Sequence, residues 1–538
     1  MATNDNRKRF NIIANKNESL ILVSLFAFSF LIRAIGLKHG FPLLLHPDEG
    51  VILDMAFFKS SEGFFFPGNP GNFIRPNQIL YTLNFIFLNF MSYLRFGEPF
   101  AARYLLYELH FYHYARFLIA VMGSMLPVLA YLIGKLFKQS FALAAGVTFL
   151  VFPSYVLHSL YVTPDVPITL FTLLVLYFTL RYLEKNEKLS LFIAVIFAAI
   201  NTAEKYPGLL SLLIILAGIL LKASQNINFS FKKQIGPVLK ISVSVLLVFI
   251  LSLFLFAPNL FIHFQMAKVG FLHSSRSTHS GADYYNFFGR LWFYINAFAS
   301  WSNILALIWL IAGLFALIKW RNRNTLLFFY GVFYWISLSV LPLHWERWAL
   351  PMYITPLFLI AIGISFLWNK YKTVPQKRWV FLVLLAFFFL QQAIMATHTS
   401  ISHVYTDTRV LALEYSQVNG ITPENSLFEG YTPFQTRQGP KTIFSDYEQQ
   451  RGNFEYIILS SGMYERFFRE PSRYIEEISF YESLREEHQL IASFEPDQMA
   501  TTPFAQLIDI INFMRHSFNP ADIDKFRGPV IEIFQVIN

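Results

Sequence analysis

The amino-acid sequence predicts a mainly helical protein that crosses a membrane many times and carries a small α/β domain at its C-terminal end. Three observations predict this fold class. Hydrophobic residues make up 55% of the 538 residues and charged residues only 14%, whereas soluble chains carry about 25% charged residues. The apolar residues form long unbroken runs, and the mean hydropathy is +0.44. Acidic residues, finally, concentrate in the last quarter of the chain.

The charge of the chain is divided between two zones. Residues 401–538 hold 11 Lys and Arg against 20 Asp and Glu, a net charge of −9. Residues 1–400 hold the remaining 32 Lys and Arg against 14 Asp and Glu, a net charge of +18. The basic residues lie in short loops between apolar runs, so they do not predict a nucleic-acid partner. The chain has no Cys, which excludes disulfides and thiolate metal sites.

Eleven apolar segments predict transmembrane helices, because a helix needs about 20 mostly apolar residues to cross a bilayer. They cover residues 18–37, 115–134, 141–158, 166–183, 189–204, 207–222, 236–258, 290–318, 325–343, 350–368 and 379–397. The pair 189–204 and 207–222 is the shortest, and Pro207 separates its two members.

Positively charged loops predict the orientation, since such loops stay on the cytoplasmic side. Arg7, Lys8 and Arg9 precede the first span, and Lys135 and Lys138 follow the second. The N-terminus is therefore predicted to be cytoplasmic. Eleven spans in a cytoplasmic (inner) membrane then place the C-terminal end outside the cytoplasm.

Two outer parts are predicted. Residues 38–114 form a long loop in which the apolar stretch 79–91 predicts a helix along the membrane surface. A boundary near residue 400 divides the chain into a transmembrane domain, 1–400, and an extracytoplasmic α/β domain, 401–538. Within this second domain the hydrophobic patterns predict strands at 425–429, 455–460 and 529–536, and helices at 407–418 and 471–487.

The first candidate site is His46-Pro47-Asp48-Glu49, directly after the first span. Charged groups near a bilayer are costly to retain, so each is a functional candidate. One of two adjacent carboxylates can act as a general base while the other orients it or holds a cation. An exposed acidic turn is the alternative. The position at the outer membrane surface favours a functional pair.

Two further candidates lie at outer ends of spans. Asp165 opens the fourth span, where it is either an N-cap or part of a site near Asp48. Lys205 lies between Glu204 and Tyr206 and departs from the inside preference of positive charges. It therefore needs a partner, which is either Glu204 or an anionic ligand such as phosphate.

The last candidate is the segment His344-Trp345-Glu346-Arg347-Trp348, before the tenth span. An arginine here can grip a phosphate or a carboxylate with two hydrogen bonds. The alternative is an interfacial arginine held by two Trp rings. Several histidines also fall on the outer side, and a metal site built from them with Asp or Glu stays open, although their spacing matches no metal motif.

These motifs occur in an order that resembles a known superfamily. After one span come His-Pro-Asp-Glu and a surface-helix loop, followed by Thr-Pro-Asp-Val-Pro, Glu-Lys-Tyr-Pro-Gly-Leu-Leu and Glu-Arg-Trp-Ala-Leu-Pro-Met-Tyr. The order resembles the GT-C superfamily of polyprenyl-phosphate-sugar glycosyltransferases. Within it, the chain is similar to the bacterial and archaeal relatives of protein O-mannosyltransferases and of the lipid A aminoarabinose transferase, which are glycosyltransferase family 39-like.

The resemblance implies roles for individual residues. Asp48 would be the catalytic general base and Glu49 its acidic partner. Lys205 and Arg347 would bind the donor phosphate. The residues expected to line the same cavity are His46, Asp165, Tyr206, His344 and Glu346.

The predicted function is therefore transfer of a sugar, a mannose-like hexose or a pentose, from a polyprenyl-phosphate donor to an acceptor hydroxyl. The acceptor is a protein, a lipid or a glycan, and a divalent metal is a possible cofactor. A multi-span transporter, or a flippase or polymerase of cell-envelope glycans, is the alternative. Transporters usually contain internal repeats. This sequence shows none, and its candidate charges gather at one membrane face.

Overall fold

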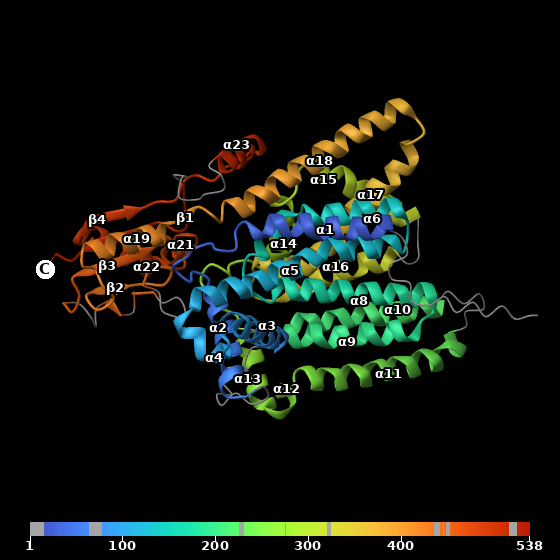
Figure 1. Ribbon diagram of the computed structural model, residues 1–538, viewed down its shortest axis with the longest axis horizontal. Coiled ribbons are helices and arrows are strands. Elements are labelled where there is room, and N and C mark those ends of the chain that lie inside the picture. Colours follow the sequence, from blue (N-terminus) through green and yellow to red (C-terminus); the bar gives the residue numbers. More distant parts are fainter. Residues whose placement is uncertain are drawn as a thin grey trace, which may run out of the picture.

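The computed structural model describes residues 16–63, 78–224, 231–274, 276–319, 324–434, 442–444, 446–447, 452–515 and 525–537. They form a long helical bundle with a small α/β domain at one end (Figure 1). The predicted fold class is confirmed. Arg7, Lys8 and Arg9, and residues 64–77 of the outer loop, lie outside the described residues.

Twelve helices of twelve residues or more build the bundle in the described part of the chain. They are α1 Lys16–Ala34, α5 Glu108–Lys135, α6 Gln139–Leu150, α8 Asp165–Lys185, α9 Lys188–Glu204, α10 Leu212–Ser224, α11 Phe231–Phe256, α14 Phe287–Ser300, α15 Leu305–Lys319, α16 Asn324–Val340, α17 Leu350–Tyr371 and α18 Pro375–Ile401. By length and composition, eight helices among the described residues can cross a membrane, or nine if one bent pair counts as a single span. The number of eleven spans stays a prediction.

Two predicted spans are divided in the structure. The segment 290–318 consists of α14 and α15, which are bent by 116° relative to each other. Asn303 starts the second helix, because its side chain accepts a hydrogen bond from the backbone N–H of Ala306. The segment 141–158 consists of α6 and the short α7, Pro153–His158. Pro153 opens α7 because proline fits the first helical turn, where its missing N–H costs nothing. As continuous helices, both predictions were wrong.

Six further helices gather at the end of the bundle beside the α/β domain (Figure 1). They are α2 Pro47–Ser61, α3 Gln78–Phe96, α4 Phe100–Arg103, the 3-10 helix η2 Tyr104–Leu106, α12 Asn259–Ile262 and α13 Phe264–Ser274. The start of α2 is well defined. The ring nitrogen Nδ1 of its N-cap, His46, accepts from the backbone N–H of Asp48, and Pro47 takes the first helical position. Because α3 is long and apolar enough to span, a surface position for residues 79–91 stays a prediction.

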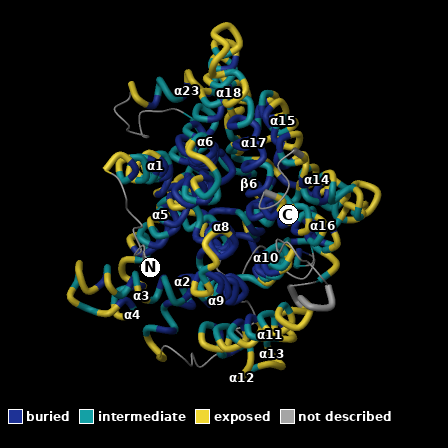
Figure 2. The backbone as a smooth tube through the Cα atoms, turned by 90° about the vertical axis from the view of Figure 1, so that its right-hand side faces the viewer, coloured by how far each residue is buried: buried dark blue, intermediate teal, exposed yellow. Residues whose placement is uncertain are grey.

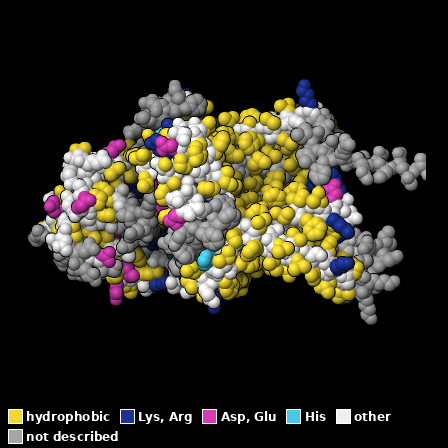
Figure 3. All heavy atoms as spheres, turned by 60° about the horizontal axis from the view of Figure 1, so that its bottom comes forward, with side chains coloured by type: hydrophobic (Ala, Val, Ile, Leu, Met, Phe, Trp, Pro, Cys, Tyr) yellow, Lys and Arg dark blue, Asp and Glu magenta, His cyan; other side chains and the backbone are white. Residues whose placement is uncertain are grey.

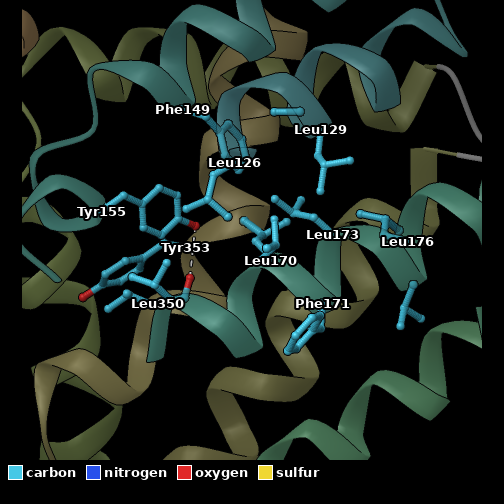
Figure 4. Packing of buried hydrophobic residues seen from close by; sticks show 14 of the residues in the cluster. Leu126, Leu129, Phe149, Tyr155, Leu170, Phe171, Leu173, Leu176, Leu350 and Tyr353 are labelled. Carbon is cyan, nitrogen blue, oxygen red and sulfur yellow. Dashed lines mark hydrogen bonds between the residues drawn. The ribbon is translucent and has the colours of Figure 1, made fainter. Parts of the chain in front are cut away.

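Three helices form the centre of the bundle: α5, α8 and the segment Glu346–Tyr371, which includes α17. The buried share of the most apolar stretch is 72% in α5 and 83% in each of the other two. The same share is only 22% in α1, 11% in α11 and 22% in α18. Seen along the bundle, the buried segments lie inside and the exposed ones outside (Figure 2). Side chains of the central helices interlock, and the hydroxyl of Tyr155 donates to the carbonyl oxygen of Leu350 at 3.1 Å (Figure 4).

The surface of the bundle is apolar over its flank. Hydrophobic side chains cover this flank, whereas charged side chains gather toward the two ends of the molecule (Figure 3). Exposed leucines and phenylalanines also occur on α11, α15 and α18, helices on the outside of the bundle. An apolar band of this kind is what a protein shows where lipid replaces water.

The C-terminal domain contains a four-stranded sheet in the order β2-β3-β6-β4. The strands are β2 Ser426–Phe428, β3 Tyr456–Ser460, β6 Ile531–Gln535 and β4 Gln489–Phe494, and only the β2–β3 pair is parallel among these. Its helices are α19 Thr408–Val418, α21 Ser461–Phe468, α22 Ile475–Glu487 and α23 Pro503–Arg515. The predicted strands and helices of this domain are confirmed.

Several elements of the C-terminal domain were not predicted. They are β4, α21, α23 and the short parallel pair of β1, Thr406–Asp407, with β5, Phe526–Arg527. The exposed face of β4 and its bulge between Leu490 and Ala492 weaken the alternating pattern that identifies a strand. Helix α18 ends at Ile401, five residues before β1. The division of the chain near residue 400 stays a prediction.

Candidate active site

A cavity of about 1110 Å³ lies where the bundle meets the C-terminal domain. The bundle side of its wall comes from the start of α2, the start of α8, the 3-10 helix η3 Tyr206–Ser211, the end of α16 and the 3-10 helix η4 Glu346–Ala349. Six of the nine predicted site residues line it: His46, Asp48, Asp165, Lys205, Tyr206 and Arg347. Glu49, His344 and Glu346 do not contribute to its wall.

Asp48 and Arg347 form one ion pair of the cavity. An Nη atom of Arg347 donates to a carboxylate oxygen of Asp48 at 2.7 Å, although the two residues are 299 positions apart. Their side chains are 29% and 27% exposed. This pair is therefore fixed in orientation and still accessible to a ligand in the cavity.

Asp165 and Lys205 form a second ion pair. The ammonium of Lys205 donates to the Asp165 carboxylate at 2.6 Å. Asp165 is the first residue of α8, after the N-cap Pro164, and its second carboxylate oxygen has no hydrogen-bond partner among the described residues. Lys205 also lies 5.6 Å from the centre of the Trp348 ring, next to Arg347. The second pair is thus adjacent to the first.

Glu204 is not the partner of Lys205. Its carboxylate is fully buried and accepts a hydrogen bond from the backbone N–H of Leu80 at 2.8 Å. Glu204 therefore fastens the start of α3 to the end of α9.

Tyr206 packs against Phe271, with 5.3 Å between the centres of the two rings. The Tyr206 hydroxyl has no hydrogen-bond partner among the described residues.

Glu49 lies behind the cavity wall. Its two carboxylate oxygens accept from Nε and Nη2 of Arg116 at 2.9 and 2.7 Å, and both side chains are fully buried. The backbone N–H of Val162 donates to the same carboxylate. Arg116 in turn donates to the carbonyl oxygens of Leu37 and His39. This buried network joins α5 to the chain segments before α2 and α8.

His344 and Glu346 also point away from the cavity. Burial lowers the pKa of His344 to about 4, and neither of its ring nitrogens has a partner in the described part of the chain. Its ring lies among the aromatic side chains of Tyr284, Tyr285 and Phe293. Glu346 accepts a hydrogen bond from the indole of Trp301 at the bend between α14 and α15.

The cavity also contains residues that the sequence analysis missed. From the C-terminal domain these are Asp407, Arg409, Tyr431, Gly462, Arg466, Arg469, Arg527 and Pro529, and from the bundle side they include Tyr161 and Arg276. His279, one of the outer histidines considered for a metal site, also lines the cavity. Residues 401–538 have a net charge of −9, so the sequence analysis treated this segment as acidic and did not single out its arginines. One signal was present, because Arg466 and Arg469 are three residues apart and so share one helix face.

The described residues offer no evident metal site. In those ranges no three His, Asp or Glu side chains are grouped closely enough to hold an ion. The three carboxylates that line the cavity, Asp48, Asp165 and Asp407, each accept from a cation. The possible divalent metal therefore has no ligand set in this part of the chain.

One family model matches part of the chain. The family model described as dolichyl-phosphate-mannose-protein mannosyltransferase matches residues 112–261. This stretch includes Arg116, Asp165 and Lys205, and it ends before Arg347. The match confirms the resemblance to polyprenyl-phosphate-sugar glycosyltransferases over this part of the chain. No curated protein sequence matches the chain.

Solved structures with similar folds include two of ArnT from Cupriavidus metallidurans. The apo structure is 12% identical, covers 88% of this chain and 96% of its own, and gives a TM-score of 0.49. The structure bound to undecaprenyl phosphate is 13% identical, covers 85% and 95%, and gives 0.47. Arabinosyltransferase EmbB from Mycobacterium smegmatis is 13% identical, covers 76% and 38%, and gives 0.40.

Proposed function

We propose that this protein is a membrane glycosyltransferase that moves a sugar from a polyprenyl-phosphate donor to an acceptor hydroxyl. One observation carries this proposal: two acid–base pairs from four distant segments meet in a single large cavity at one end of a membrane bundle. The family match over residues 112–261 supports the same reaction class.

In the proposed reaction, Asp48 is the general base. The acceptor oxygen forms a bond to the anomeric carbon of the sugar while the bond from that carbon to the phosphate oxygen breaks. The hydroxyl proton passes to the carboxylate of Asp48, and the electron pair leaves with the polyprenyl phosphate. A hydroxyl is a poor nucleophile at neutral pH, so removal of its proton in the transition state accelerates the attack.

Arg347 and Lys205 are proposed to bind the donor phosphate. The phosphate gains negative charge as it leaves, and fixed cations stabilise that charge strongly in a site shielded from water. Both cations now contact carboxylates, Asp48 and Asp165 respectively. Those contacts hold the two cations in place before the donor arrives, and each carboxylate offsets the charge of its own cation. Asp165 is proposed to position Lys205.

The cavity also has an apolar side suited to the lipid part of the donor. Its apolar lining includes Leu209 and Leu210 of η3, Phe271 of α13, and Leu338 and Leu341 at the end of α16. Leu209 is 48% exposed and Phe271 50% exposed. A polyprenyl chain could lie on this side in contact with the membrane while its phosphate reaches the two cations.

The remaining predicted residues are proposed to position the site. His46 caps the helix that carries Asp48. Glu49 holds that helix against α5 through Arg116, and this geometry favours a supporting role over direct catalysis. Glu346 ties η4 to the bend after α14 through Trp301. Tyr206 forms part of the cavity wall, and His344 packs the segment before η4.

We further propose that the cavity faces the outside of the cytoplasmic membrane. Charged groups at the bundle end far from the C-terminal domain include exposed Lys and Arg side chains (Figure 3), as expected for a cytoplasmic end. The C-terminal domain, residues 401–538, would then be extracytoplasmic, and the transmembrane domain would cover residues 1–400. A mannose-like hexose or a pentose is the proposed sugar.

The test is sugar transfer in membranes, from a radiolabelled polyprenyl-phosphate sugar to endogenous acceptors, at equal expression of each variant. Asp48→Asn is expected to reduce transfer by about 100-fold or more, the usual contribution of a general base. Glu482→Gln, at an exposed position of α22, is the matched control and should transfer normally. Equal transfer by Asp48→Asn and the wild type would remove Asp48 from the mechanism. No transfer by the wild type with any such donor would favour a transporter, flippase or polymerase.

A further inference from the structure

The wall that the C-terminal domain contributes to the cavity is rich in arginine. Seven cations and three carboxylates line the cavity among the described residues. On the bundle side, Lys205 and Arg347 are each matched by a carboxylate. The surplus of positive charge therefore lies on the side formed by the C-terminal domain.

Of the arginines on this side, Arg409 is neutralised within the domain. It forms a bidentate ion pair with Asp407 at 2.7 and 2.8 Å. Arg469, directly after α21, lies 3.7 Å from the Glu465 carboxylate, its one ion-pair partner among the described residues. Arg466 and Arg527 donate to the neutral carbonyl oxygens of Gly462 and Ser402, respectively, and no carboxylate of the described residues lies within 4.0 Å of either guanidinium. Arg466 and Arg527 thus face the cavity without a carboxylate partner among the described residues.

The backbone around Arg466 is shaped to hold its side chain at the cavity. The guanidinium lies 5.1 Å from the centre of the Tyr431 ring. Tyr431 has a φ of 61°, which non-glycine residues seldom adopt. A Cβ atom at Gly462 would lie 3.2 Å from the Tyr431 side chain, and one at Gly281 would lie 3.3 Å from that of Arg466. Unusual backbone conformations of this kind cluster at functional sites.

A second hollow connects to this wall from the side of the C-terminal domain. It measures about 470 Å³ and shares Gly462, Arg466, Arg469 and Pro529 with the cavity. The two arginines thus stand between the two hollows. A molecule that reaches Asp48 from the C-terminal domain would pass them before it meets the acid–base pairs.

We propose that Arg466, Arg469 and Arg527 bind an oxyanion of the phosphate type on the acceptor substrate. This proposal rests on the proposed function and adds the substrate class: the acceptor carries an anionic group besides the hydroxyl that receives the sugar. Arginine suits the task because its planar fork binds two oxygens of a phosphate at once. The donor phosphate has its own cations on the bundle side, so the two anions of the reaction occupy separate places.

The test is a calorimetric titration of the full-length protein in uncharged detergent with glucose 6-phosphate, which combines hydroxyls with a phosphate. Glucose is the neutral probe. The wild type is expected to bind glucose 6-phosphate and not glucose. Arg466→Gln is expected to lower the affinity for glucose 6-phosphate at least tenfold. Arg466→Lys, which keeps the charge, should recover part of this loss. The matched control is Arg515→Gln, at the exposed end of α23 and outside both hollows, and it should bind as the wild type does.

Three results would overturn the proposal. The first is no binding of glucose 6-phosphate to the wild type, and the second is unchanged binding by Arg466→Gln. The third is binding that Lys205→Gln abolishes and Arg466→Gln leaves intact, which would assign the anion to the donor phosphate site. No donor is present in this titration. Its outcome is therefore separate from that of the transfer assay, which tests the proposed function itself.

Discussion

Asp48 and Glu49 are neighbours in the chain, but they belong to two different regions of the molecule. Asp48 faces the cavity and shares a partly exposed ion pair with Arg347. Glu49 points into the bundle and shares a fully buried pair with Arg116. Consecutive residues of a helix point about 100° apart, since a turn takes 3.6 residues. One short acidic motif can therefore place one carboxylate in the cavity and the other in a buried ion pair that supports the fold.

This comparison predicts that folding stability depends far more on the buried pair Glu49–Arg116 than on the partly exposed pair Asp48–Arg347. Glu49→Ala leaves the Arg116 guanidinium buried without its carboxylate, which should cost about 3–5 kcal/mol of folding free energy. Asp48→Ala removes a partly exposed pair, which should cost about 1 kcal/mol or less. Thermal unfolding of the two variants in one detergent measures the difference. Similar unfolding temperatures for both variants would contradict this difference in stability.

The second prediction concerns the ion pair of Lys205 and Asp165, in which Lys205 is partly exposed and Asp165 is buried. Lys205→Gln strands a carboxylate that is only 1% exposed, so we expect a loss of about 3 kcal/mol of folding free energy together with loss of sugar transfer. Adding Asp165→Asn to this variant removes the stranded charge. Stability should then largely return, because the two substitutions are coupled, while transfer should stay low. If transfer returned along with stability, Lys205 would only support the fold.

The third prediction compares Glu49 with a buried carboxyl that lacks a direct cationic partner. Burial raises the pKa of Glu429, in the C-terminal domain, to about 8 from an ordinary value of 4.5. The folded chain therefore keeps this proton between those pH values, whereas the unfolded chain releases it. Stability from this group is complete below about pH 4.5 and falls as the pH rises toward 8.

Hydrogen exchange at β3 can measure this effect, since the backbone N–H of Ser460 donates to the Glu429 carboxyl. Protection of β3, corrected for the intrinsic exchange rate, should decline from pH 5 to pH 8 in the wild type. In Glu429→Gln, which carries no titratable group, the decline should be smaller. A decline of equal size in both proteins would assign the pH dependence to another group.

The smallest effect is expected at His344. This side chain packs among aromatic rings outside the cavity, and its lowered pKa of about 4 keeps it neutral at physiological pH. His344→Phe should change the rate of sugar transfer by no more than about twofold, less than ~0.5 kcal/mol on the barrier. A much larger loss, or an altered pH profile of transfer between pH 5 and 7, would bring His344 into the site.

Local patterns in the sequence were enough to predict most elements. Apolar runs identified the helices of the bundle, and short hydrophobic patterns identified β2, β3 and β6. The same reasoning joined α14 to α15, because average hydropathy does not register the single capping residue Asn303. Hydropathy likewise could not decide whether α3 crosses the membrane or lies on it.

The candidate site was predictable residue by residue but not in its pairings. Each of Asp48, Asp165, Lys205 and Arg347 was identified as a charge too costly to keep near lipid without a purpose. Sequence proximity suggested Glu204 as a partner for Lys205, and the structure pairs Lys205 with Asp165 instead. The arginines of the C-terminal domain were missed because a soluble domain carries charges at no cost. Only the fold shows which of them reach the cavity.

The separations along the chain also set an order in time. Synthesis proceeds from the N-terminus, so contacts between nearby segments can form while later segments are still on the ribosome. Lys205 meets Asp165 across 40 residues and Arg116 meets Glu49 across 67, but Arg347 meets Asp48 only across 299. The support behind the site can thus be complete while the site is not. A nascent chain shorter than about 350 residues would hold Asp48 in position yet lack Arg347, and would therefore be inactive until most of its helices had entered the membrane.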